Sequence, residues 1–248
     1  MAENALYTVQ SNTCIAKDVY HMRVTGPTGS IRAPGQFVNI KLDGFYLRRP
    51  ISISDWDAEG MDLIYKIMGK GTAQMAGFEK GRVLDMLAGL GNGFNIRKAA
   101  GKKVVIVGGG VGLPPLYGLA KWLISTGNTP KLLAGFRGAG DVFYMEEFEK
   151  LGCEICLDTE DGSAGEKGFV TAPMCASAFD YYFACGPLPM LKAVKELGQQ
   201  MGVEGQLSLE ARMGCGMGAC MGCTCKTETG PKRVCLEGPV FTSQEVQL

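Results

Sequence analysis

The chain has 248 residues, which is long enough for two domains and a small third module. Its 25 lysines and arginines balance 25 aspartates and glutamates, so its charge gives no sign of a nucleic-acid or membrane-surface partner. The start, MAENALYTVQSN, lacks the basic-then-apolar pattern of a signal peptide, and no apolar run approaches the ~20 residues of a membrane span. Disulfide-dense scaffolds are small and secreted, so the ten cysteines predict reduced thiols, some on a metal, in a cytoplasmic protein.

Residues 1–98 predict a β-rich domain. Short apolar or alternating runs such as QFVNIKL, MDLIYKIM and RVLDMLAGL are separated by glycine, proline and aspartate turns. Strands of this length and spacing are typical of an antiparallel barrel or a sandwich. The segment GTAQMAGFEKG predicts one short helix within this domain.

Residues 99–204 predict a doubly wound domain with a parallel sheet. A buried strand over 103–107 leads into a glycine turn and then a helix with an apolar stripe. Strands (KLLAGFRG, CEICLDT, DYYFACGP) then alternate with helices (YMEEFEKLG, LPMLKAVKELGQQMG), which indicates parallel strands joined by crossovers. Residues 205–248 show little periodicity and are too few to bury a core, so we expect a metal to hold them together.

Five cysteines gather in this last segment. Cys215, Cys220 and Cys223 have the spacing C-x4-C-x2-C, and Cys235 follows after eleven further residues. This is the plant-type spacing of a [2Fe–2S] cluster, with three ligands on one loop and a distant fourth. A structural zinc site is the alternative, but zinc usually takes paired short knuckles and only one is present. We favour the cluster and leave Cys225 as the spare thiol.

Two stretches of the first domain suit a flavin with a pyrophosphate. In LRRPISIS, Arg48 and Arg49 form an arginine fork before a strand, which suits phosphate oxygens, although such a pair is often only solvated. In IYKIMGKGT, Gly71 and Thr72 lie at a predicted helix start, where backbone N–H groups favour a phosphate. An ordinary turn into a helix is the alternative there.

The second domain carries a glycine turn that suits a pyridine nucleotide. In VVIVGGGVGLPP the glycines follow a strand and precede a helix, which is the context of a dinucleotide site even though the spacing is not a clean G-x-G-x-x-G. For the adenine ribose, Arg137 could take a 2′-phosphate, whereas Asp158, Glu160 and Asp161 would favour NAD. We favour NAD.

These motifs, in this order, resemble the ferredoxin–NADP reductase superfamily: RPIS matches its flavin motif, GKGT its pyrophosphate loop, and CGP its nicotinamide-side motif. Ile51 stands where the flavin motif usually has an aromatic residue. By this resemblance, the FAD-binding residues are Arg49, Pro50, Ile51, Ser52, Ile64, Tyr65, Lys66, Gly71 and Thr72. By the same resemblance, NAD is bound by Gly109, Gly110, Gly112, Cys185, Gly186 and Pro187. For Cys185 the alternative is a buried thiol at a strand end.

Adding RMGCGMGACMGC and RVCLEGPVF, the whole chain resembles electron-transfer subunits of NAD-dependent (class 1B) dihydroorotate dehydrogenases, enzymes of pyrimidine biosynthesis. This resemblance implies a catalytic partner that contains FMN, a two-plus-two heterotetramer, and electrons passing from FMN through the cluster to FAD and then as hydride to NAD+. The rival enzymes are a related flavin and iron–sulfur subunit of a ferredoxin:NADP oxidoreductase or of a sulfide dehydrogenase. A rival of another class is a non-enzymatic adaptor stabilised by zinc.

No acid–base machinery accompanies these motifs. His21 is the only histidine, and we expect it to be structural. The sequence has no G-x-S-x-G motif and no cysteine–histidine pair, so the chemistry belongs to the cofactors. Met217 and Met221 predict an apolar surface around the cluster that could face a partner.

Overall fold

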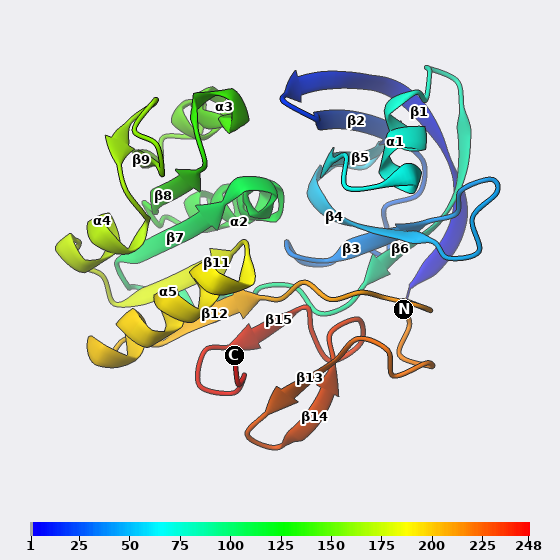
Figure 1. Ribbon diagram of the computed structural model, residues 1–248. Coiled ribbons are helices and arrows are strands. Elements are labelled where there is room, and N and C mark those ends of the chain that lie inside the picture. Colours follow the sequence, from blue (N-terminus) through cyan, green and yellow to red (C-terminus); the bar gives the residue numbers. More distant parts are fainter. Residues whose placement is uncertain (1) are drawn as a thin grey trace.

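A computed structural model describes residues 2–248. The chain forms a barrel, an open sheet covered by helices, and a C-terminal segment that passes beneath the barrel, forms a small hairpin and returns to the sheet (Figure 1). No helix within the described range is long and apolar enough to cross a membrane. All ten cysteines are free thiols.

The barrel is closed and antiparallel, with the strand order β1-β2-β5-β4-β3-β6. Its six strands are β1 (Glu3–Ala16), β2 (Val19–Thr25), β3 (Phe37–Ile40), β4 (Arg49–Trp56), β5 (Gly60–Lys66) and β6 (Val83–Leu90). Along β6, buried residues alternate with residues that are exposed or half-buried, as expected for a strand with one face on a core. The short helix α1 (Lys70–Ala76) follows β5 and buries Met75. The sequence predicted either a barrel or a sandwich, and the barrel is confirmed.

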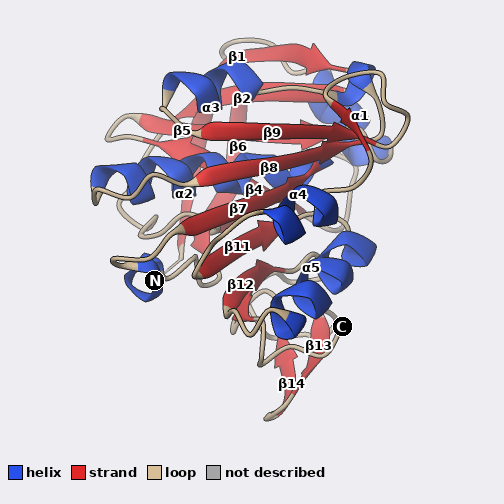
Figure 2. Ribbon diagram, turned by 90° about the vertical axis from the view of Figure 1, so that its left-hand side faces the viewer, coloured by secondary structure: helices blue, strands red, loops and turns tan. Residues whose placement is uncertain are grey.

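The second part is a seven-stranded sheet in the order β10-β9-β8-β7-β11-β12-β15. Its strands are β7 (Val104–Gly109), β8 (Lys131–Phe136), β9 (Glu154–Thr159), β10 (Glu166–Lys167), β11 (Tyr181–Cys185), β12 (Gly205–Ser208) and β15 (Val240–Thr242), of which only β15 is antiparallel to its neighbour. Every residue of β7 is buried, because helices lie on both faces of the sheet (Figure 2). The predicted doubly wound fold is confirmed.

Helices and short 3₁₀ turns connect these strands. They are η1 (Ile96–Ala99), η2 (Gly110–Gly112), α2 (Leu113–Ser125), η3 (Ala139–Asp141), α3 (Met145–Lys150), α4 (Thr171–Ala176) and α5 (Leu188–Gln200). Strand β10 and helix α4 were not predicted, because two and six residues are too short to show a period.

The C-terminal residues are tied to the sheet as well as to one another. Strands β12 and β15 complete the sheet. Leu207, Phe241 and Val246 are buried in one of the hydrophobic cores that the sheet helps to form. The remaining residues form the hairpin β13 (Thr224–Thr227) and β14 (Gly230–Arg233). Packing therefore helps to hold this segment, beyond the metal that its length alone suggested. The domain limits 1–98, 99–204 and 205–248 stay predictions.

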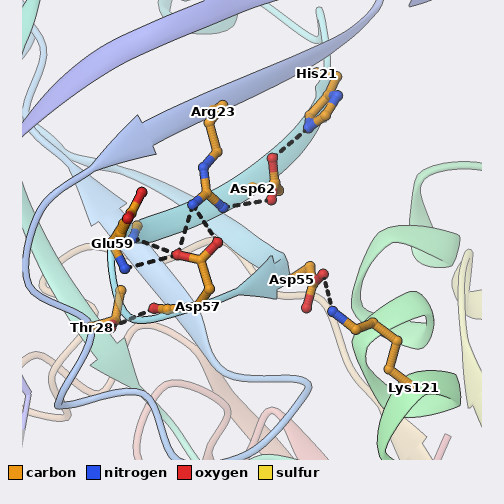
Figure 3. Close-up of polar contacts among 9 residues, drawn as sticks. His21, Arg23, Thr28, Asp55, Asp57, Glu59, Asp62 and Lys121 are labelled. Atoms are coloured by element: carbon orange, nitrogen blue, oxygen red, sulfur yellow. Dashed lines mark hydrogen bonds and ion pairs between the residues drawn. The ribbon is translucent and has the colours of Figure 1, made fainter.

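Helix α2 joins the barrel to the sheet. Lys121 Nζ lies 2.5 Å from a carboxylate oxygen of Asp55 on β4 (Figure 3). The rings of Trp56 and Trp122 lie 5.8 Å apart beside this ion pair. The sequence places a glycine, Gly118, where α2 passes the backbone of β4, and a Cβ there would lie 2.7 Å from a carbonyl oxygen of the strand. Because Gly118 has no side chain, α2 and β4 approach closely at this point, and their contact sets how the barrel faces the sheet.

Candidate functional site

The four predicted cluster ligands lie as two pairs of thiols. Cys215 and Cys220 each accept a hydrogen bond at sulfur from the other's backbone N–H, both at 3.4 Å. The backbone N–H of Cys235 donates to Cys223 Sγ at 3.4 Å. Each iron of a [2Fe–2S] cluster takes two of the four protein ligands, so two pairs suit such a cluster.

A single zinc ion would instead need its ligands around one point. Within residues 2–248, no group of three or more histidine, cysteine, aspartate or glutamate side chains is placed to hold one metal ion. Four sulfur donors arranged as two pairs fit a two-iron cluster.

Backbone N–H groups of small residues in the loop point at the sulfurs. The N–H of Ala219 donates to Cys215 Sγ at 3.2 Å, and the N–H of Gly218 donates to Cys235 Sγ at 3.1 Å. Burial disfavours the Cys215 thiolate, but the N–H donors outweigh it and lower the pKa of Cys215 to about 6. Burial and the neighbouring Cys223 raise the pKa of Cys235 to about 12. At Cys215, its first ligand, the loop thus favours the thiolate, which is the form that binds metal.

The fifth thiol lies beside the site. Cys225 is half-buried on β13, where it pairs with Lys232 of β14, and burial raises its pKa. Arg233, at the end of β14, donates through Nη1 to the carbonyl of Gly218 at 2.6 Å and forms an ion pair with Glu237. This arginine links the cluster loop (residues 215–223) to the turn that carries the fourth ligand.

The two stretches predicted to bind flavin phosphates meet in space. Arg49, at the start of β4, lies against Gly71 at the start of α1, so closely that a Cβ at Gly71 would collide with the guanidinium. Thr72 accepts the N–H of Met68 at 2.8 Å and so caps the turn. An arginine and free backbone N–H groups at one place suit a pyrophosphate. Arg48 takes no part, since it pairs with the Asp85 carboxylate at 2.9 Å.

The other residues predicted to bind FAD lie on the two neighbouring strands. Pro50, Ile51 and Ser52 are half-buried on β4, and β5 carries the remaining ones. Ile64 and Tyr65 of β5 are buried, and the Tyr65 hydroxyl donates to Asn12 at 2.9 Å. Lys66 pairs with Asp141 at 2.9 Å, which makes a second contact between the barrel and the sheet. Because these side chains are engaged, β5 would meet FAD through its backbone. These assignments stay predictions.

The predicted NAD residues lie together at the switch point of the sheet. After β7 the chain builds strands to one side, and β11 returns on the other side of β7. Ligands of open α/β sheets bind in the crevice at this point. A Cβ at Gly109 would lie 2.9 Å from Pro187 Cδ, and one at Gly112 would collide with the carbonyl of Cys185. Gly110 has room around it and a φ of 50°. The glycines thus let the two loops pack closely against each other, and only Gly110 has open space beside it.

Cys185 and the acidic residues complete this edge. Burial raises the pKa of the Cys185 thiol to about 12, which disfavours its thiolate form. Asp158 is buried, and burial raises its pKa. Asp161 is exposed and accepts the Ser163 N–H at 2.9 Å. A Cβ at Gly138, just after β8, would lie 2.5 Å from the Asp161 carboxylate. Asp161 therefore lies near the end of β8, where Arg137 is exposed to solvent.

The single histidine, which we expected to be structural, lies in a network of charged side chains. His21 Nε2 lies 2.7 Å from a carboxylate oxygen of Asp62, and Arg23 holds the other oxygen at 2.8 Å (Figure 3). Arg23 also pairs with Asp57 in the turn between β4 and β5. This network lies on the outside of the barrel strands.

Sequence reasoning missed two asparagines of the barrel that reach the cluster. Asn39 of β3 donates to the carbonyl of Cys215 at 3.3 Å. Asn92, just after β6, donates to the carbonyls of Leu236 and Glu237. The one available signal was a polar residue within the apolar run QFVNI; for Asn92 the sequence holds none.

Comparison with known proteins identifies the family. Residues 210–247 match the model of the iron–sulfur cluster binding domain of dihydroorotate dehydrogenase B. Two relatives bear the name dihydroorotate dehydrogenase B (NAD(+)), electron transfer subunit. The one from Fusobacterium nucleatum is 43% identical over 256 residues, covering 97% of each chain. The one from Bacillus velezensis is 44% identical over 259 residues, covering 99% of this chain and 100% of its own.

Solved structures agree on the fold. The structure of an NADH-dependent reduced ferredoxin-NADP oxidoreductase has a TM-score of 0.87 and 29% identity, and the match covers 100% of this chain and 91% of that one. An Amycolatopsis cytochrome P450 reductase has a TM-score of 0.71 at 22% identity over 80% of this chain and 66% of its own. The chain belongs to the family of electron transfer subunits of dihydroorotate dehydrogenase B (NAD(+)).

Proposed function

We propose that this chain carries electrons from a catalytic partner subunit to NAD+, using a [2Fe–2S] cluster on Cys215, Cys220, Cys223 and Cys235 and an FAD in the barrel. The observation that carries the proposal is the arrangement of these four thiols as two pairs, in a segment that the barrel holds directly. FAD, when bound, supplies the exchange of a hydride with NAD and of single electrons with the cluster.

The chain's own residues bind and orient these groups. Arg49 and the backbone at Gly71 would hold the FAD pyrophosphate, and the loops at Gly109–Gly112 and Cys185–Pro187 would hold the nicotinamide nucleotide. Since the chain has no nucleophile–base motif and its chemistry comes from its cofactors, the oxidation of dihydroorotate belongs to a partner that contains FMN. Asp161, at the ends of β8 and β9, supports NAD over NADP by repelling a 2′-phosphate. Thiolate ligands stay reduced in the cytoplasm, where we place the protein.

The partner would dock over the cluster loop, in a two-plus-two heterotetramer. Met217, Met221 and Leu236 expose 53%, 52% and 43% of their surface around the cysteines. Met221 also has a φ of 59°, a conformation that is costly for a residue with a long side chain. An exposed apolar side chain kept in such a conformation supports a role in binding a partner.

The likeness to the NADH-dependent reduced ferredoxin-NADP oxidoreductase favours one second candidate, a subunit of an enzyme of that kind. Co-purification from the native source, followed by iron, sulfide and flavin analysis, separates the candidates. We expect two irons, two sulfides and one FAD per chain, and NAD+ reduction that depends on dihydroorotate. A partner without FMN, or a complex that reduces NADP+ from ferredoxin and ignores dihydroorotate, would contradict the proposal. One zinc per chain would favour the adaptor.

A further inference from the structure

The barrel reaches the first cluster ligand through one buried side chain. Asn39 lies in β3 with none of its surface exposed, and its Nδ2 donates to the carbonyl oxygen of Cys215 at 3.3 Å. The next residue, Gly216, approaches so closely that a Cβ there would collide with Nδ2 of the same amide. The amide therefore rests directly on the backbone of the cluster loop.

A second barrel side chain reaches the last ligand. Asn92, which follows β6, donates through Nδ2 to the carbonyl oxygens of Leu236 at 3.2 Å and Glu237 at 3.0 Å. Its backbone N–H also donates to the carbonyl of Gly238 at 2.6 Å. These carbonyls belong to the closing turn (residues 235–238), which starts with Cys235.

The two contacts have a common geometry. Strands β3 and β6 are neighbours in the barrel; Asn39 lies on β3 and Asn92 lies just after the end of β6. Cys215 and Cys235 belong to different thiol pairs. Asn39 therefore holds the backbone at a ligand of one pair, and Asn92 holds the backbone next to a ligand of the other pair. Arg48 braces Asn39 by donating to its carbonyl at 3.3 Å while it pairs with Asp85. The backbone that carries both pairs is thus fixed to the flavin barrel from one side.

Stability alone does not explain Asn39. Its other amide atom, Oδ1, is buried and has no hydrogen-bond partner in the range 2–248. A buried polar atom without a partner is destabilising, so an apolar residue of the same size would serve a purely structural role better. The gain from the amide lies in the directed contact with the Cys215 carbonyl.

We propose that Asn39 and Asn92 are positioning residues that hold the cluster loop and the closing turn against the barrel and thereby set the separation between cluster and flavin. The proposal rests on the proposed function, because it assumes both groups. Electron transfer between two centres slows steeply with their separation, so a loop held from the flavin side keeps this step fast and reproducible.

The test uses the holoprotein with the substitutions Asn39→Leu and Asn92→Ala, singly and together. The control is Asn128→Ala, which removes an amide that also donates to a backbone carbonyl, that of Lys102 at 3.0 Å, within the sheet domain. Hydrogen exchange is followed in peptides that cover residues 213–222 and 234–239. We expect faster exchange in the first peptide for Asn39→Leu, in the second for Asn92→Ala, and in neither for the control.

Rapid mixing with NADH gives the second readout. Flavin absorbance reports the hydride step, and the electron paramagnetic resonance signal of the reduced cluster reports the next electron. In the double variant we expect an unchanged flavin step, a cluster step slowed by about 10-fold or more, and a broadened cluster signal.

Unchanged exchange and an unchanged cluster step in the double variant would overturn the proposal. So would loss of iron from both single variants, which would assign the amides to cluster retention. The proposal would also be overturned if the cluster step were slowed no more in the double variant than in Asn128→Ala. A wild-type chain without FAD or iron and sulfide would instead contradict the proposed function.

Discussion

The absence of a side chain at Gly71 leaves room for the guanidinium of Arg49. A Cβ there would meet the guanidinium of Arg49, which is the far end of a flexible side chain and can move away at little cost to folding. Gly71→Val should therefore displace Arg49 and weaken FAD binding about 10-fold, as should Arg49→Gln, because a hydrogen bond to a charged group is worth ~1.5–3 kcal/mol. Fluorescence titration of the flavin-free chain with FAD measures both.

The double variant tests whether the two residues act together. If Gly71→Val works by displacing Arg49, combining it with Arg49→Gln should add little to either single effect. Arg82→Gln is the matched control, since Arg82 is exposed and pairs with the exposed Asp43. Effects that add fully would show that Gly71 contacts FAD independently of Arg49.

The spare thiol gives a second prediction at this scale. Cys225 lies on β13 outside both thiol pairs, so Cys225→Ser should retain two irons and two sulfides per chain. Cys235→Ser should lose most of them, because Cys235 is paired with Cys223. Iron and sulfide analysis of the two purified variants measures the difference. The reverse pattern would make Cys225 the fourth ligand.

Among the elements, the turn between β4 and β5 carries a charge that matters at low pH. The Asp57 carboxylate accepts the backbone N–H groups of Glu59 and Gly60, at 2.8 and 3.0 Å, and pairs with Arg23 (Figure 3). The Glu59 N–H, and then Arg23, hold the pKa of Asp57 below its ordinary value of 3.8. Its stabilisation is thus complete above pH 3.8 and is lost as the pH falls through the lower folded-state pKa.

Asp57→Asn should therefore cost about 0.5 kcal/mol of unfolding free energy near neutral pH, a small value because the side chain is more than half exposed. The difference from wild type should shrink below pH 3.8, where the carboxyl becomes neutral in both. Urea unfolding of both chains at matched pH values measures it. A difference that stays constant down to strongly acidic pH would rule out the charge as its cause.

Helix α2 sets how the barrel faces the sheet, and Gly118 is its closest contact. Gly118→Ala places a Cβ 2.7 Å from the carbonyl of Ser54, so helix and strand must move apart. We expect slower flavin reduction by NADH in stopped-flow measurements, with unchanged iron content, because the residues predicted to bind flavin belong to the barrel and those predicted to bind the nucleotide belong to the sheet. Gly140→Ala, where a Cβ meets nothing within 4 Å, is the control. Equal rates in both variants would contradict the prediction.

The sequence predicts the elements and motifs of this molecule better than their contacts. The barrel strands, α2 and the cysteine spacing each carry a local signal, so they could be read directly. Asn39 and Cys215 are 176 positions apart, and Lys66 and Asp141 are 75 apart, so only the folded chain brings them together. Strands β12 and β15 have four and three residues, and their place in the sheet depends on neighbours rather than on their own pattern.

For the molecule as a whole, the face around the cluster decides whether it can assemble. Met217→Lys combined with Met221→Lys should abolish co-purification with the catalytic partner, because each introduces a charge into an apolar contact. Iron content and flavin reduction by NADH should remain, since both side chains are exposed and neither is a ligand. Met201→Lys, at the end of α5, is the matched control and should leave the complex intact. Size-exclusion chromatography of the co-expressed subunits measures assembly, and a complex that survives the double substitution would place the docking face elsewhere.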